Sequence, residues 1–162
     1  MNMHTPNMVQ QIEALQLRYI DALDSKDMNG WLETFDSKGS YICRTAESET
    51  RGLDISLILD DCHERLQDRV KFITRVWAGT FQDYQTRHFV QRLDSRQLDD
   101  GLYEMRSNFT VMFTRSDTGE TALFAAGVYL DTVSIGREGA SFRSKKAIID
   151  APILPHYMVY PL

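Results

Sequence analysis

Apolar residues in the first half of the chain recur at helical spacing. Helical spacing is shown by Val9, Ile12, Leu15, Tyr19, Ala22 and Leu23, which predicts one amphipathic helix. The stretch DSKD at 24–27 ends this helix, because Asp and Ser side chains compete for backbone hydrogen bonds. Asp27 can cap a short second helix that carries Trp31, Leu32 and Phe35, and a turn with a short strand is expected over 37–45. A third helix, with Asp54 near its start, is predicted from the apolar set Ile55, Ile58, Leu59, Cys62, Leu66 and Val70.

The second half changes to alternating polar and apolar positions. Four segments, 86–93, 102–115, 120–135 and 140–150, are rich in β-branched and aromatic residues. The polar stretches DSRQLDDG, SDTG and GREG between them each carry a glycine, as turns do. Three successive antiparallel strands joined by hairpins are therefore expected.

Helices followed by hairpin-connected strands predict an α+β fold, with the helices on one face of a curved sheet. Residues 1–162 are expected to form a single domain. Its last part, at about 151–162, holds three prolines, which favour extended structure, together with several large apolar side chains. We expect this tail to dock, either onto its own domain or onto a partner, and hypothesise that it packs at a subunit boundary.

Composition and charge narrow the class of protein. The chain is 43% hydrophobic and 25% charged, with a net charge of -5 and no cluster of basic residues, so nucleic acid is not an expected partner. The N-terminal sequence lacks the features of a signal peptide, and no apolar run approaches the roughly 20 residues that span a bilayer. Cys43 and Cys62 are too few for a disulfide framework. A cytoplasmic protein with reduced thiols and no membrane partner is expected.

Motifs for metals and nucleotides are missing. His4, His63, His88 and His156 are scattered, and Cys62-His63 has no matching second pair, so no metal or cofactor is expected in this chain. The sequence also lacks a glycine-rich phosphate loop and a nucleophile elbow.

General acid/base chemistry needs only one or two ionisable groups inside an apolar pocket, which a cone of helices and curved sheet can provide. The candidates are Tyr19, Asp21, His88, Asp131 and Asp150. A structural polar group is the commoner explanation for each of them. Strand alternation points Arg87 and Phe89 to one face and His88 to the other.

Several segments resemble known families. The stretch YIDALDSKDMNGWLETFDSKGSYIC resembles the opening of the cystatin-like, or nuclear-transport-factor-like, cone fold. The segments DRVKFITRVWAGTFQDYQTRHFVQRL, YEMRSNFTVMFTR and AAGVYLDTV resemble the small (β) subunit of Rieske-type aromatic ring-hydroxylating dioxygenases. In that family an Arg-His pair opens a strand, and a later strand carries a Gly-x-Tyr-x-Asp pattern, matched here by Gly127, Tyr129 and Asp131.

The ending KKAIIDAPILPHYMVYPL looks most like the branch acting on aromatic carboxylates such as anthranilate, salicylate, benzoate or terephthalate. Two stretches depart from the family pattern. The loop FQDYQT replaces one that commonly holds prolines and a serine, and Gln91-Arg92 replaces a frequent Asn.

The resemblance implies a non-catalytic structural subunit that trimerises within an α3β3 assembly. The large (α) subunit would carry the Rieske [2Fe-2S] cluster and mononuclear Fe(II), and a reductase or ferredoxin would deliver electrons from NADH. His88 is then an interface or core residue. The interface candidates are Trp77, Tyr84, Arg87, His88, Tyr157, Tyr160 and Leu162.

Two other functions remain open. One is a stand-alone dehydratase, isomerase or cyclase of the same fold that uses Tyr19, Asp21, His88 and Asp131. The other is a ligand-binding module without chemistry. The subunit hypothesis is favoured by the apolar tail and by six aromatic residues able to fill the cone: Trp31, Phe35, Phe109, Phe113, Phe124 and Tyr129.

Overall fold

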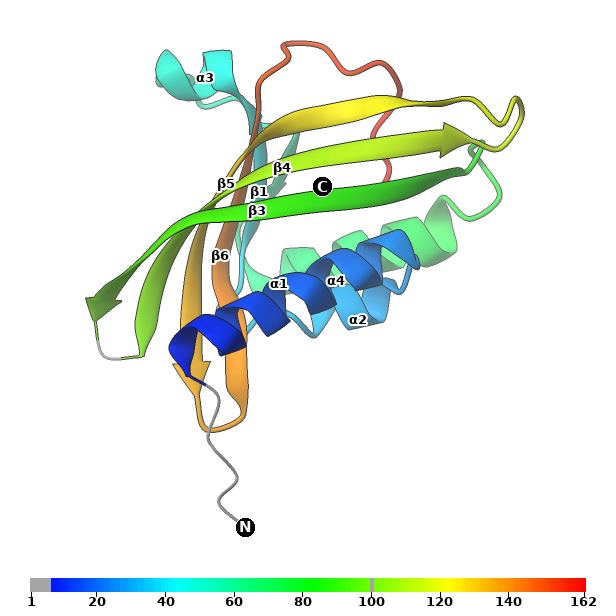
Figure 1. Ribbon diagram of the computed structural model, residues 1–162. Coiled ribbons are helices and arrows are strands. Elements are labelled where there is room, and N and C mark those ends of the chain that lie inside the picture. Colours follow the sequence, from blue (N-terminus) through cyan, green and yellow to red (C-terminus); the bar gives the residue numbers. More distant parts are fainter. Residues whose placement is uncertain (1–6, 100) are drawn as a thin grey trace.

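A curved sheet wraps around a long helix in the computed structural model, which describes residues 7–99 and 101–162 (Figure 1). The helices are α1 (Met8–Asp24), α2 (Met28–Leu32), α3 (Ala46–Thr50) and α4 (His63–Lys71), which continues into a π-helical turn, η1 (Phe72–Val76). The strands are β1 (Tyr41–Thr45), β2 (Ile58–Asp60), β3 (Tyr84–Asp99), β4 (Leu102–Arg115), β5 (Thr121–Gly136) and β6 (Gly139–Ile149).

The first helix forms as its sequence predicts, whereas the second ends at Leu32, before Phe35, which the sequence also placed on it. Asn7 and Gln10 make a capping box at the start of α1, and the apolar stripe of that helix is buried. Asp27 caps α2 by accepting a hydrogen bond from the N–H of Gly30 at 2.9 Å. The α1 stripe contacts β3, β5 and β6, so this helix lies along the concave side of the sheet.

The expected third helix is wrong over its first half. Residues Ile58–Asp60 form β2, which pairs antiparallel with β1, and α4 begins only at His63. Ile58 and Asp60 are buried while Leu59 is 41% exposed, which is the alternation of a strand. A short set of apolar residues can fit the helix repeat and the strand repeat equally well, and here the pairing with β1 favours the strand. The short helix α3 was not anticipated.

Strands β3 to β6 are joined by antiparallel hairpins, so the run holds four strands where three were expected. The order across the sheet is β2-β1-β6-β5-β4-β3, and β1 lies parallel to β6. Register shifts at Val111/Met112 and Thr132/Val133 mark irregularities that accompany bending of the long strands. The predicted α+β cone, with helices on a curved sheet, is confirmed.

Gly127 permits the close approach of β5 to β6. A Cβ atom at this position would collide with the carbonyl oxygen of Ile148. Two and four residues further on, Tyr129 and Asp131 share the inner face of β5 and are buried. The Gly-x-Tyr-x-Asp pattern therefore combines one close strand contact with two inward side chains.

Side chains occupy the inside of the cone. The six aromatic residues expected to fill it are each at most 5% exposed: Trp31, Phe35, Phe109, Phe113, Phe124 and Tyr129. Phe109 and Tyr129 stack with ring centroids 4.2 Å apart. Tyr19 of α1 meets Tyr129 and Phe142 edge to face.

The tail returns to its own domain. Its first part is exposed, with Ile153 at 81%, but Val159, Tyr160 and Leu162 are at most 7% exposed. In Figure 1 the tail rises from the end of β6, arcs over the top of the view and passes behind β5 and β4 toward the C label. No helix among residues 7–99 and 101–162 is long and apolar enough to cross a membrane.

Candidate functional site

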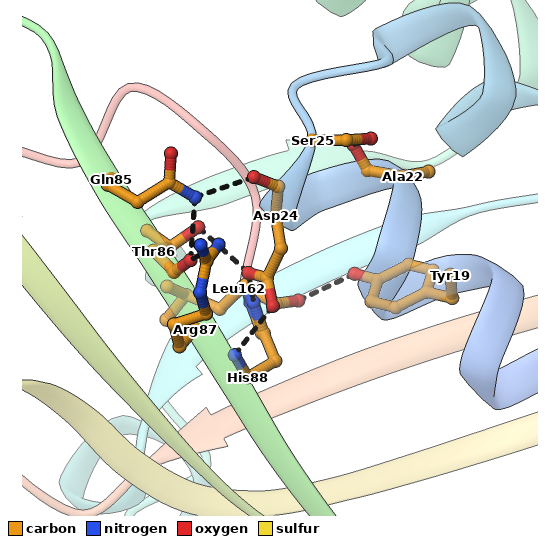
Figure 2. A network of polar contacts seen from close by, with 9 residues as sticks. All are labelled: Tyr19, Ala22, Asp24, Ser25, Gln85, Thr86, Arg87, His88 and Leu162. Carbon is orange, nitrogen blue, oxygen red and sulfur yellow. Dashed lines mark hydrogen bonds and ion pairs between the residues drawn. The ribbon is translucent and has the colours of Figure 1, made fainter.

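A carboxylate at the end of α1 binds a histidine of β3. Asp24 Oδ1 lies 2.6 Å from His88 Nδ1, and Asp24 Oδ2 accepts the main-chain N–H of His88 at 2.9 Å. Thr86 donates to the same carboxylate, and Gln85 donates to the main-chain carbonyl of Asp24 (Figure 2). Together these contacts fix the end of α1 to the start of β3.

The electrostatics of Asp24 follow from these contacts. Burial acts to raise the pKa of Asp24, but the hydrogen bonds and charge of His88 outweigh burial and lower that pKa. The His88 side chain is 1% exposed, and its Nε2 has no hydrogen-bond partner among the described residues. An Asp-His pair can orient a general base, but a base also needs room for substrate next to its free nitrogen.

A second pair lies deeper. Lys145 of β6 donates to Asp131 of β5 at 2.8 Å, and both side chains are 0% exposed. Lys145 Nζ also sits 3.7 Å from the ring centroid of Tyr129 and 4.4 Å from those of Tyr19 and Phe142. A cation surrounded by three aromatic faces replaces part of its lost hydration by cation–π attraction.

Burial moves both members of this pair toward their neutral forms. It raises the pKa of Asp131 and lowers that of Lys145, and the attraction between the two charges opposes both shifts. Asp131 Oδ1 and the hydroxyl of Tyr129 have no hydrogen-bond partner among the described residues. This is a dense buried polar centre with aromatic walls.

The remaining space beside it is taken by Leu162. The Tyr19 hydroxyl donates to the Leu162 carbonyl oxygen at 2.5 Å. The Tyr41 hydroxyl accepts the N–H of Leu162 at 2.9 Å and lies 3.2 Å from the same carbonyl oxygen. The end of the tail is therefore buried inside the cone, where it is hydrogen-bonded to Tyr19 and Tyr41.

Two surface hollows lie elsewhere. One of about 630 Å³ lies near the β5–β6 turn and includes Gly101 and Arg143. Another, of about 250 Å³, lies between α1 and the strands β3 and β4, with Gln16 and Met105 in its wall. Neither includes the Asp24–His88 or the Lys145–Asp131 pair.

The predicted acid/base residues do not form one cluster. Tyr19 and Asp131 both approach Lys145, whereas His88 pairs with Asp24 instead. Asp21 and Asp150 are exposed. The arrangement needed for the stand-alone enzyme, in which Asp21 and Asp131 work with His88, is not present.

The sequence reasoning missed three residues of this interior: Asp24, Tyr41 and Lys145. Two signals were readable. Lys145 alternates in phase with the apolar Ala147 and Ile149, which puts it on the inner face of its strand. Asp24 is an acidic residue in the last turn of a helix, where the dipole disfavours it unless it has a partner.

Among the described residues, no group of three or more His, Cys, Asp or Glu side chains could hold a metal ion. Cys43 is buried, and its burial raises the pKa of the thiol to about 12. Cys62 is partly buried, and both cysteines are free.

The interface candidates divide by exposure. Tyr84, His88, Tyr160 and Leu162 are buried in the chain's own core, so contact with another subunit would require their exposure. Arg87 and Tyr157 are exposed and Trp77 is partly exposed. These three are accessible in the single chain.

Comparison with known proteins adds the family. Residues 18–156 match the model of the family described as ring hydroxylating beta subunit. The small subunit of anthranilate 1,2-dioxygenase from Burkholderia cepacia is 29% identical over 152 residues, which cover 94% of this chain and 92% of that protein. Subunit beta 2 of the terminal oxygenase component of terephthalate 1,2-dioxygenase from Comamonas sp. is 28% identical, covering 94% of this chain and 97% of that protein.

The fold is also found in solved structures. A beta subunit from Novosphingobium aromaticivorans, described as that of an aromatic-ring-hydroxylating dioxygenase, superimposes with a TM-score of 0.81. It is 21% identical and the match covers 93% of each chain.

Proposed function

The chain belongs to the ring hydroxylating beta subunit family, and we propose that it is the non-catalytic, structural member of an oxygenase acting on an aromatic carboxylate. Its relatives are subunits of aromatic ring-hydroxylating dioxygenases, which are oxidoreductases. Two of them are named for anthranilate and terephthalate, and both of these compounds are aromatic carboxylates. Those names support an aromatic carboxylate as the class of substrate.

The observation that carries the structural role is the filled cone. Lys145 and Asp131 neutralise each other at its centre, and Leu162 is hydrogen-bonded to Tyr19 and Tyr41 beside them. A catalytic histidine would need open space at its free nitrogen, whereas His88 is buried. These contacts support a scaffold and give no support to the dehydratase, isomerase or cyclase alternative.

The proposed partner is the large oxygenase subunit. In this proposal three copies of the chain form the base of an α3β3 assembly. The large subunit supplies a Rieske [2Fe-2S] cluster and a mononuclear Fe(II), and a reductase or ferredoxin passes it electrons from NADH. Arg87, Tyr157 and Trp77 are the accessible candidates for contact between subunits. The cytoplasmic location stays a prediction.

Coexpression with the large subunit tests this function. The tagged chain is purified with and without that subunit, and mass and iron content are measured for each preparation. We expect a complex of three large and three small chains that holds all the iron. This complex should consume O2 when NADH, reductase and an aromatic carboxylate are added. The chain alone should hold no iron and consume no O2.

Two results would contradict the proposal. One is turnover by the isolated chain in a dehydration, isomerisation or cyclisation assay. The other is a large subunit that assembles and turns over equally well without this chain.

Benzene, as a ring without a carboxylate, is the matched control for the substrate class.

A further inference from the structure

The end of the tail is held in the way a bound peptide is held. We call residues 157–162 the tail end. Its main-chain N–H groups at Val159 and Leu162 donate to the hydroxyls of Tyr84 and Tyr41, at 3.0 and 2.9 Å. Tyr19 donates to the Leu162 carbonyl oxygen. Side chains of three different elements, α1, β1 and β3, thus bind the tail backbone.

The side chains of the tail end act as anchors. Val159, Tyr160 and Leu162 are buried, and the Tyr160 hydroxyl donates to Asp83 Oδ1 at 3.0 Å. At the outer limit, the Tyr157 hydroxyl donates to the carbonyl of Gln82 at 2.7 Å. Alternate anchoring by pockets and main-chain hydrogen bonds is how proteins recognise extended peptides.

The segment that leads to the tail end has a different character. Pro152, Ile153 and Pro155 are exposed, so this stretch connects β6 to the tail end without being buried itself. Prolines at 155 and 161 restrict the chain and lower the entropy lost when it docks. The buried residues of the tail therefore all lie in the tail end.

The tyrosine hydroxyls are suited to main-chain groups. Burial raises the pKa values of Tyr19 and Tyr41 well above the usual value, and it raises that of Tyr84 to about 12. All three stay protonated at neutral pH, so each can donate to a carbonyl or accept from an N–H.

We propose that the interior of the cone is a binding site for a short, extended, apolar peptide, and that the tail end is its resident, separable ligand. The site is formed by Tyr19, Tyr41 and Tyr84 together with the apolar surface that covers Val159, Tyr160 and Leu162. This inference does not depend on the proposed oxygenase function, because it concerns only contacts within the chain.

Cleavage of the folded, full-length chain tests the proposal. A protease recognition sequence replaces residues 151–154, where the chain is exposed apart from the partly buried Leu154, and the protein is cut after folding. A fluorescein-labelled peptide with the sequence of residues 155–162 is then added, and its binding is measured by fluorescence polarisation. We expect the cut fragment to stay bound through gel filtration and to be displaced by the labelled peptide in a saturable manner.

Variants separate peptide binding from general stability. Tyr41→Phe keeps the ring but leaves Leu162 N–H without its acceptor, so the peptide dissociation constant should rise by about tenfold or more. Tyr103→Phe on β4 removes a hydroxyl from a partly buried tyrosine elsewhere and is the control. Circular dichroism spectra verify that both variants are folded before cleavage.

Three outcomes would overturn the proposal. The fragment could be lost on cleavage without rebinding of the peptide, or it could stay bound and never exchange in native buffer. In the third case, Tyr41→Phe and Tyr103→Phe would bind the peptide equally well. Each result would make the tail end an integral part of the core and not a ligand.

Discussion

Asp24 and His88, 64 positions apart in the sequence, are joined by two hydrogen bonds, one to the imidazole and one to the main chain. The contact joins the last residue of α1 to the third inward residue of β3, after Tyr84 and Thr86. A carboxylate at the C-terminal end of a helix is repelled by the negative end of the helix dipole, and the hydrogen bonds from His88 offset this repulsion.

His88→Ala is expected to lower the free energy of unfolding by about 1–3 kcal/mol, because Asp24 loses the partner of a buried hydrogen bond. Urea titration followed by circular dichroism measures this loss. The Asp24→Ala variant and the double variant complete the cycle, and the combined loss should be smaller than the two single losses added. A variant of normal stability whose oxygenase complex loses turnover by orders of magnitude would instead assign His88 a catalytic role.

Stability should fall in acid partly through Asp24. Its pKa is lowered in the folded protein, so its stabilisation is complete above the unfolded value of about 4 and disappears as the pH falls through the folded value. Unfolding free energies measured from pH 6 to pH 2.5 should therefore depend less on pH in Asp24→Asn. Asp21→Asn, on an exposed position of the same helix, is the control. Equal pH dependence in Asp24→Asn and the unsubstituted protein would exclude this contribution.

Lys145→Met should be among the most damaging substitutions. It leaves the Asp131 carboxylate buried without its cation, a loss of about 3–5 kcal/mol. The double variant with Asp131→Leu removes both charges and should be more stable than Lys145→Met alone. Lys146→Met provides the comparison on the other face of β6, where the partly exposed pair with Glu49 is worth about 1 kcal/mol or less. Similar losses of stability for the two lysine substitutions would show that removing the cation of the buried pair costs no more than removing that of the exposed one.

Gly127→Ala should destabilise the sheet by about 1–3 kcal/mol, because the added methyl group meets the backbone of Ile148 and cannot displace it cheaply. Gly136→Ala, near the end of the same strand, has no atom of the described residues within 4 Å of the added carbon and should be close to neutral. Thermal unfolding of the two variants compares them directly. The steric explanation fails when both variants melt at the temperature of the unsubstituted protein.

The exposed part of the tail remains our candidate for a subunit boundary. Ile153 is 81% exposed, so Ile153→Asp should leave the melting temperature of the isolated chain unchanged. At an apolar interface the buried charge should weaken assembly with the large subunit by about tenfold or more. Light scattering coupled to size exclusion measures the assembly, with Ile55→Asp, at 61% exposure, as the control. Unchanged assembly in Ile153→Asp would remove this residue from the boundary.

The sequence by itself determined the first helix, the hairpin-joined strands of the second half and the resemblance to the family. The period of apolar residues marks α1, Asp27 caps α2 as expected, and alternation places His88 and Arg87 on opposite faces of β3. These features depend on residues a few positions apart, whose geometry is set by helix and strand repeats. The Gly-x-Tyr-x-Asp pattern likewise could be matched without knowing which strand lies beside it.

Only the tertiary structure decided the contacts made across the chain. The strand at Ile58–Asp60 exists because β1 lies beside it, although its spacing also suits a helix. The partner of His88 is 64 residues away, and the tail end meets Tyr41 from 121 residues away. Local sequence preferences carry no information about contacts at such separations, because packing in three dimensions selects which buried polar groups meet.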